Sequence, residues 1–331
     1  MTSPLDVEAV PEVPAEEHLG ALDDERYAAL LTRLSHQSVV KHYDAFADVA
    51  WDAPEMRVDP DDPRWILSSD DALGRTEWYQ AQPAAVRSRI GLHMLCTFMQ
   101  IGIEFESVLQ RGLLDFAQHL PPGAPEFRYV YHEVIEEGQH SLMFAEFVRR
   151  AGLPVRGLAW WQRIGSRQVL RFARTFPELF FVFVLGGEDP IDHVQRRALS
   201  SGRAGHPLIR RIMQIHVTEE ARHLCFARHY LRRRVPRLSA VKRFVLSRRA
   251  PVILAIMSQM MMRPSATIVR TYGIPKAVIR EAYTRNPEHR ARTQEAVGKV
   301  RGLLGELGLY EGGAARVWRL LGLAAPPVAA A

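Results

Sequence analysis

The chain has 331 residues, 47% of them hydrophobic, which is enough to bury a large core. Its longest strongly apolar run, Leu179 to Leu185, is far shorter than the roughly 20 residues that cross a bilayer, so we expect no transmembrane helix and no membrane partner. The net charge of +6 comes largely from arginine, and we interpret it as solvated helix faces because no nucleic-acid-binding motif accompanies it.

The first 22 residues are acidic and rich in proline, and they lack the basic start and apolar middle of a secretory signal. We predict a disordered tail on a cytoplasmic protein. Two isolated cysteines, Cys96 and Cys225, are too few to stabilise a fold of this size through disulfide bonds, and both are interpreted as buried thiols. Residues 23–322 are expected to form one domain, followed by a flexible tail over 323–331.

Glycine and proline divide the rest into long segments with almost no alternating β-branched runs, which predicts an all-α protein. After a short helix come a long irregular connection, which often caps a site, and then four long helices. The third of these is expected to bend at Pro177. The expected ranges are 24–40 for the short helix, 51–82 for the connection, and about 83–120, 126–150, 160–199 and 208–234 for the long helices. Shorter helices follow, including 256–262 and 298–310.

Two of these helices carry nearly the same pentapeptide, EEGQH and EEARH, 83 positions apart. Residues three apart on a helix share a face, so Glu137 and His140 can reach one point in space, as can Glu220 and His223. His216 lies seven residues before His223, almost two complete turns, and projects in nearly the same direction. Each pentapeptide is therefore a candidate metal chelate, and the second gains a third ligand.

The other two long helices each offer a buried acid. On the first, Glu106 is the only charge in an inward-facing hydrophobic row, whereas Glu104 falls on a polar face. An unpaired carboxylate inside a bundle is costly, so Glu106 needs a strong partner such as a metal. On the third helix, Glu188 follows a continuous apolar run and is expected at core depth, with Asp192, one turn later, as the alternative.

One Glu from each of two helices and a Glu-x-x-His from each of the other two is the ligand pattern of ferritin-like di-iron and di-manganese carboxylate proteins. We therefore predict an all-α fold, a ferritin-like four-helix bundle at about 84–234 with additional peripheral helices. Oxygen and imidazole ligands suit iron or manganese. The predicted metal ligands are Glu106, Glu137, His140, Glu188, His216, Glu220 and His223.

Four segments, FESVLQRGLL, EVIEEGQHSLMF, GGEDPID and IHVTEEARHLCFA, resemble the di-iron N-oxygenases similar to p-aminobenzoate N-oxygenase, with support from HQSVVKHYDAFADVAWD. The resemblance covers about residues 35–235, and the same seven residues match the family's iron ligands. It implies two iron ions, O2 activation through a peroxo-diferric state, and N-oxygenation of an amine, aromatic by preference, to a hydroxylamine or nitro product. It also suggests a homodimer.

The reducing equivalents need a source outside this chain, because it has no visible Gly-rich dinucleotide fingerprint and no iron–sulfur cysteine set. We expect a reductase or ferredoxin as the electron donor. Three other interpretations stay open: an iron-oxidising or iron-storage protein, a di-iron C–H hydroxylase or desaturase, and a basic helical adaptor with a vestigial site. The sequence does not identify the substrate.

Overall fold

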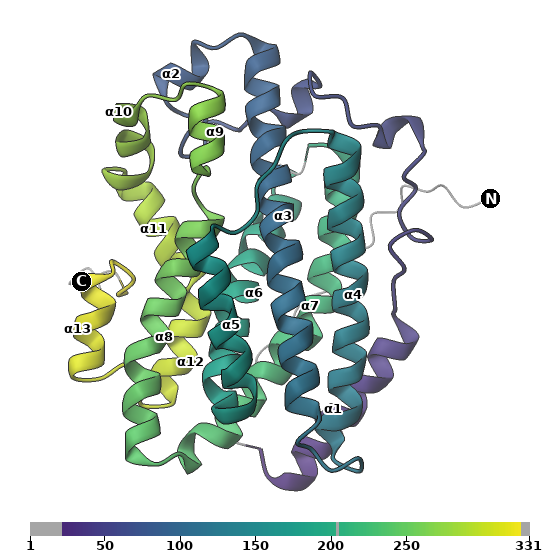
Figure 1. The fold of residues 1–331 in the computed structure, drawn as a ribbon, viewed down its shortest axis with the longest axis vertical. Coiled ribbons are helices and arrows are strands. Elements are labelled where there is room, and N and C mark those ends of the chain that lie inside the picture. Colours follow the sequence, from purple (N-terminus) through teal and green to yellow (C-terminus); the bar gives the residue numbers. More distant parts are fainter. Residues whose placement is uncertain (1–21, 203–204, 326–331) are drawn as a thin grey trace.

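The computed structural model describes residues 22–202 and 205–325 (Figure 1). Within these ranges it consists of helices and irregular connections without a strand, which confirms the predicted all-α class. Residues 1–21 of the expected N-terminal tail and 326–331 of the C-terminal tail lie outside the described residues. Leu323, which was assigned to the flexible C-terminal tail, is only 3% exposed and packs in the core. The packed part of the chain therefore continues past residue 322.

Four long helices form the bundle: α3 (Ala84–Ala117), α4 (Pro125–Ala151), α6 (Pro177–Ser200) and α7 (Pro207–Arg234). Helix α3 packs along α4 and α6 packs along α7, while contacts of α3 with α6 and of α4 with α7 close the bundle (Figure 1). Proline opens α4, α6 and α7, where its missing N–H costs nothing because first-turn N–H groups have no partner within the helix.

The third predicted helix is in fact two helices. Where one helix over 160–199 with a bend at Pro177 was expected, the structure has α5 (Trp160–Thr175) and then α6. Between them Phe176 leaves the helical region, with φ −151° and ψ 66°, because a proline ring clashes with a helical residue before it. Helix α6 enters the bundle, whereas α5 lies outside it against α3 and α6.

The remaining helices surround the bundle (Figure 1). Helix α1 (Asp24–Val40) packs on α4 and α7, and α8 (Ala240–Met261) packs on α6. The shorter ones are α2 (Glu77–Gln80), α9 (Ala266–Thr271), α10 (Lys276–Ile279), α11 (Pro287–Ala296), α12 (Gly298–Glu306) and α13 (Gly313–Leu320). Single turns of 3-10 helix occur at Pro54–Met56, Pro63–Trp65 and Val235–Arg237, and a π-helical turn at Arg280–Thr284.

Two apolar clusters fill the bundle at different heights. One includes Leu109 of α3, Tyr129 of α4 and Phe226 of α7, together with residues of α1, α6 and α8. The other includes Met99 of α3 and Phe147 of α4, and it continues into α7 and the connection before α3. On α4 and α7 the stretch between the two clusters carries the predicted ligands, and on α3 Glu106 lies at the edge of the first cluster, directly after Phe105. The polar centre is therefore enclosed by apolar layers above and below.

The expectation that no helix spans a membrane rested only on the longest unbroken apolar run. Judged by length and composition, one helical segment of the described chain, Ala240–Thr271, could cross a bilayer, and 28% of its most apolar stretch is buried. Core helices of soluble proteins meet the same criterion, so a single segment of this kind is weak evidence for a membrane.

Candidate metal centre

The structure brings all seven predicted ligands together in the middle of the bundle. None of the seven side chains is more than 2% exposed. Their ligand atoms form overlapping groups in which the atoms lie within 4.8 Å of one another. These groups are Glu106 with His140 and His216, Glu137 with His140 and Glu220, Glu188 with His216 and Glu220, and Glu137 with His223 and a further acid, Glu133.

The two alternative acids lie elsewhere. The carboxylate of Glu104 points away from the bundle and accepts hydrogen bonds from Leu158 N at 3.1 Å and from Arg163 Nη2 at 3.3 Å. Asp192 accepts a hydrogen bond from Arg196 Nε at 2.7 Å. Glu106 and Glu188, by contrast, each lie in one of the groups that could hold a metal ion.

Within each pentapeptide the histidine faces its own glutamate. His140 Nδ1 lies 2.9 Å from Glu137 Oε2, and His223 Nδ1 lies 3.0 Å from Glu220 Oε1. His223 Nδ1 is also 3.0 Å from Glu137 Oε1, so the two chelates meet at a shared carboxylate. The ring of His216 lies 4.7 Å from that of His140, which places the third imidazole in the same cluster.

The first glutamate of each pentapeptide holds the histidine of the other. His140 Nε2 donates to Glu219 Oε2 at 2.9 Å, and His223 Nε2 donates to Glu136 Oε2 at 2.7 Å. Such bonds fix which ring nitrogen carries the proton and leave the Nδ1 lone pair facing the centre. This pairing was not predicted from the sequence, although the doubled glutamate in both copies was a signal for it.

These two outer glutamates are themselves held in place. Arg222 Nη2 donates to Glu136 Oε1 at 2.7 Å and lies 3.7 Å from Glu219 Oε1. The backbone N–H of Tyr43, in the connection that precedes α3, donates to Glu219 Oε1 at 3.3 Å. The irregular connection thus supports the centre from outside the bundle, as long connections often do.

Burial and mutual repulsion oppose the charge on Glu106, Glu188 and Glu220, whereas at Glu137 the neighbouring His223 and His140 outweigh burial and lower the pKa well below its usual value. Burial raises the pKa of Glu106 well above its usual value, and the neighbouring Glu137 and Glu188 raise it further. The imidazoles differ from one another. Although burial lowers the pKa of His140, Glu137 and Glu219 outweigh it and raise that pKa to about 10, whereas burial and the neighbouring His140 lower the pKa of His216 well below its usual value. The site therefore favours cations.

Several buried polar atoms at the centre have no hydrogen-bond partner among the described residues. They are Oε2 of Glu106, both carboxylate oxygens of Glu188, Oε2 of Glu220 and Nδ1 of His216. A buried acceptor without a donor is costly, and a metal ion would satisfy several of them at once. The donor set of carboxylates and imidazoles fits iron or manganese.

A further acid, Glu133, was missed. It lies one turn before Glu137 on α4, is fully buried, and shares a group with Glu137 and His223. Neither of its oxygens has a hydrogen-bond partner, and burial raises its pKa well above the usual value. The four-residue spacing from Glu137 would have placed it on the same face of the helix.

Comparison with known proteins agrees with this geometry. The family model for p-aminobenzoate N-oxygenase AurF matches residues 24–308. Uncharacterized proteins of Mycobacterium bovis and Mycobacterium tuberculosis are each 39% identical to this chain over 303 residues, which covers 92% of this chain and 89% of theirs. No solved structure gives a significant match. The chain therefore belongs to the p-aminobenzoate N-oxygenase family, a family of di-iron oxygenases.

Proposed function

We propose that the protein is a di-iron N-oxygenase that uses O2 to oxidise an amine, preferentially an aromatic one, to a hydroxylamine and onward to a nitro compound. The observation that carries the proposal is the buried cluster of carboxylates and imidazoles at the middle of the bundle, in a chain of this family. Membership of this family supports the reaction class, and the buried cluster supports a site for the metals.

The seven predicted ligands would hold two iron ions. Four of them are carboxylates, whose charge balances that of two Fe(II) ions, and three are neutral imidazoles. Iron is proposed over manganese because the family's enzymes use iron. Bound iron would supply the redox chemistry with O2.

The protein's own residues orient the imidazoles and keep water out. Glu136 and Glu219 accept the Nε2 protons of the two histidines and hold their Nδ1 lone pairs toward the centre. Phe144 lies beside the rings of His140 and His216, with centroids 6.3 and 5.6 Å away. The apolar layers above and below limit the access of solvent protons to the reacting oxygen.

The reaction requires an external electron source. In the first step, one atom of O2 becomes the hydroxyl oxygen on the amine nitrogen, and the other leaves as water after taking up two electrons and two protons. We propose that a separate reductase or ferredoxin delivers these electrons.

The test is a single turnover with labelled oxygen. Protein loaded anaerobically with iron and reduced with dithionite is mixed with 18O2 and aniline, and the products are analysed by mass spectrometry. We expect N-phenylhydroxylamine that carries one 18O atom. Glu106→Gln is expected to lower both bound iron and product at least tenfold, because it removes a buried ligand. Glu104→Gln, on the same helix but outside the cluster, is expected to retain its iron.

Two outcomes would contradict the proposal. Oxidation of the iron without any oxygenated amine, across a panel of amines, would indicate an iron-oxidising protein. Label found on carbon instead of nitrogen would indicate a C–H hydroxylase on the same bundle.

A further inference from the structure

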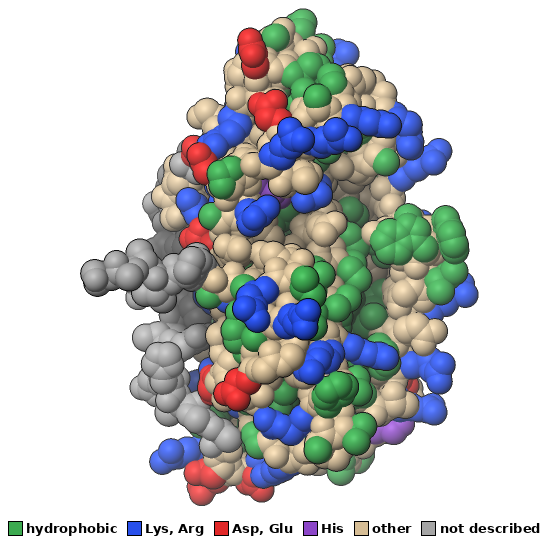
Figure 2. All heavy atoms as spheres, turned by 90° about the vertical axis from the view of Figure 1, so that its left-hand side faces the viewer, with side chains coloured by type: hydrophobic (Ala, Val, Ile, Leu, Met, Phe, Trp, Pro, Cys, Tyr) green, Lys and Arg blue, Asp and Glu red, His purple; other side chains and the backbone are tan. Residues whose placement is uncertain are grey.

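A small apolar pocket lies between α3, α5, α6 and α8. Its volume is about 190 Å3, and its walls include Val108 of α3, Trp161 and Gly165 of α5, and Met257 of α8. The face of the molecule that carries α8 is hollowed, and hydrophobic side chains are visible inside the hollow (Figure 2). An apolar cavity of roughly 150 Å3 binds benzene, so a volume of this size accommodates one aromatic ring.

One wall of the pocket is built by residues that neighbour the candidate ligands in the chain or pack on such neighbours. Phe105 and Phe183 line the pocket, and their rings stack at 5.0 Å between centroids. Phe105 immediately precedes the candidate ligand Glu106, and its ring fills the space beside Gly187, where a Cβ would lie 2.2 Å from the ring. Gly187 in turn precedes Glu188. The Phe105 ring therefore joins the pocket wall to the backbone of α6 at the residue before Glu188.

The pocket contains no group that would hold an anion. Its lining residues, all within the described chain, include no Lys, Arg or His. The one charged lining residue is Glu104, whose carboxylate is already bonded to Leu158 N and Arg163. A substrate carboxylate placed here would lose its hydration, meet no cation and lie near a second carboxylate.

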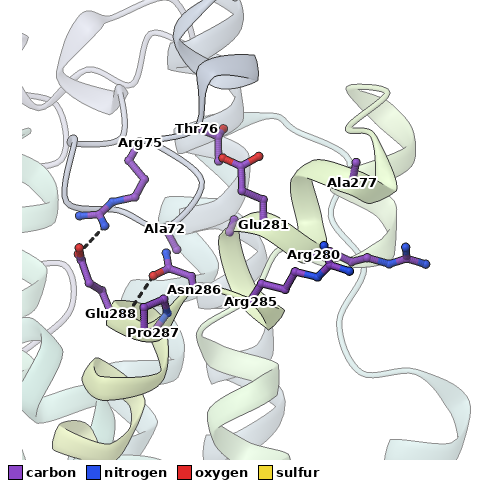
Figure 3. A pocket seen from close by; sticks show the side chains of 11 residues that line it. Ala72, Arg75, Thr76, Ala277, Arg280, Glu281, Arg285, Asn286, Pro287 and Glu288 are labelled. Atoms are coloured by element: carbon purple, nitrogen blue, oxygen red, sulfur yellow. Dashed lines mark hydrogen bonds and ion pairs between the residues drawn. The ribbon is translucent and has the colours of Figure 1, made fainter.

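Cations line a different pocket. Arg75, Arg280 and Arg285 surround a more open space of about 640 Å3 next to the π-helical turn (Figure 3), where Arg75 pairs with Glu288. None of the seven candidate metal ligands lines either pocket, but Phe105, the neighbour of Glu106, lines only the apolar one. The molecule thus has one pocket lined by arginines and one without a cation. The lack of cations in the apolar pocket indicates that its ligand carries no negative charge.

The outer wall of the apolar pocket is weakly held. Of the residues of α5, only Ala173 is buried, while Trp160, Trp161 and Ile164 are all more than half exposed. An element with so few buried contacts opens at low free-energy cost. Helix α5 is therefore suited to act as a movable cover over the pocket.

We propose that this pocket binds an uncharged, single-ring aromatic amine next to the metal centre, beneath α5, and discriminates against amines that carry a carboxylate. The assignment rests on the proposed function for the role of the amine as substrate. It adds a substrate class, namely neutral arylamines, that is set by the residues of this chain.

The test measures binding without turnover. The full chain is loaded with zinc(II), which does no redox chemistry, and is titrated with aniline and with p-aminobenzoate by calorimetry. We expect aniline to bind at least tenfold more tightly than p-aminobenzoate. Gly165→Phe fills the pocket from a position where an added Cβ meets nothing within 4 Å, and it should weaken aniline binding at least tenfold. Gly302→Phe, at an equally open site on α12, is the matched control and should leave aniline binding unchanged.

A second variant introduces the missing cation. Ser166→Arg, also on the pocket wall, should improve p-aminobenzoate binding at least fivefold and leave aniline binding nearly unchanged. Equal binding of the two ligands by the unmodified chain, or no response to either pocket variant, would overturn the assignment. A change of sedimentation instead of binding in Gly165→Phe would also overturn it, because it would show that a second copy covers the mouth.

The binding test is independent of the oxygenation test. If neutral amines bind as described and no amine is oxygenated by the iron form, the proposed function fails and the pocket stands. If labelled hydroxylamine forms while the pocket variants bind and react like the unmodified chain, the proposed function stands and the pocket assignment fails.

Discussion

Each histidine of the two pentapeptides is oriented by a glutamate from the other one. We predict that Glu136→Gln or Glu219→Gln lowers zinc affinity about 10- to 100-fold, because each removes the carboxylate that holds the Nε2 proton of His223 or His140. Competition with a chromophoric chelator measures the affinity. Glu146→Gln, on α4 but paired with Arg149 and Arg150 away from the centre, is the control and should show no change.

Unchanged zinc affinity in both variants would show that packing alone orients the imidazoles. The same comparison also separates orientation from ligation. A ligand variant such as Glu106→Gln should change the amount of metal bound, whereas an orienting variant should change the affinity at full occupancy.

At the scale of single residues, the helical periodicity predicted which side chains face the inside of the bundle. It did not predict which residue of another helix each of them contacts. Glu106 was preferred to Glu104 because residues two apart on a helix differ by about 200° in direction, so only one of the two can lie in the hydrophobic row. The partners of His140 and His223 depend on how α4 and α7 are placed against each other, which spacing within either helix does not encode. The doubled glutamates therefore stayed unexplained until the fold was known.

Among the helices, α7 is capped at its N-terminus by His206, and this cap depends on the protonation state of the ring. His206 Nδ1 accepts a hydrogen bond from Leu208 N, and His206 Nε2 donates to Arg57 O, each at 3.2 Å. Only the neutral ring can do both, because a protonated Nδ1 has no lone pair for the helix N-terminus. Burial, with a further contribution from the positive charge of Arg64, lowers the pKa of His206 to about 4.

The sign of the pH effect follows from this shift. The unfolded chain binds a proton at about pH 6.5 and the folded chain only near 4, so the contribution to stability is complete above 6.5 and falls as the pH drops toward 4. We expect His206 to account for a loss on the order of 2 to 3 kcal/mol over that window. Urea unfolding of His206→Asn, which caps without titrating, should lack this part of the pH dependence. Parallel curves for both proteins would refute the assignment.

The break before α6 is a feature that the local sequence alone does not determine. Pro177 excludes a helical conformation at Phe176, and a kinked helix and two separate helices both satisfy that requirement. The packing of α6 into the bundle selects two helices, because α5 then lies outside on α3. Helix positions were accordingly predicted well, while the break was predicted only as a bend.

For the molecule as a whole, the centre makes folding stability depend on metal. Without a cation, the clustered buried acids repel one another, as the raised pKa of Glu106 and of Glu188 indicates. A metal at 100 times its dissociation constant adds about 2.7 kcal/mol. We therefore expect the melting temperature to rise by several degrees when zinc or manganese replaces a chelator in a calorimetric scan.

The variant Glu188→Gln distinguishes the repulsion between buried carboxylates from the binding of metal by Glu188. It removes one buried charge, so the metal-free variant should melt no lower than the metal-free parent, while its gain from metal should shrink. An equal metal-dependent gain in both proteins would show that Glu188 takes no part in binding the metal.

The crossed pairing of the two pentapeptides also fixes when a working centre can exist during synthesis. His140 leaves the ribosome well before Glu219. A nascent chain that ends in α6 therefore contains Glu137 and His140 but lacks the glutamate that orients the His140 ring. The same holds for any fragment that contains α7 without α4, because His223 then lacks Glu136. Neither half can hold a metal ion in the final geometry, so the centre is complete only after α4 and α7 have packed against each other.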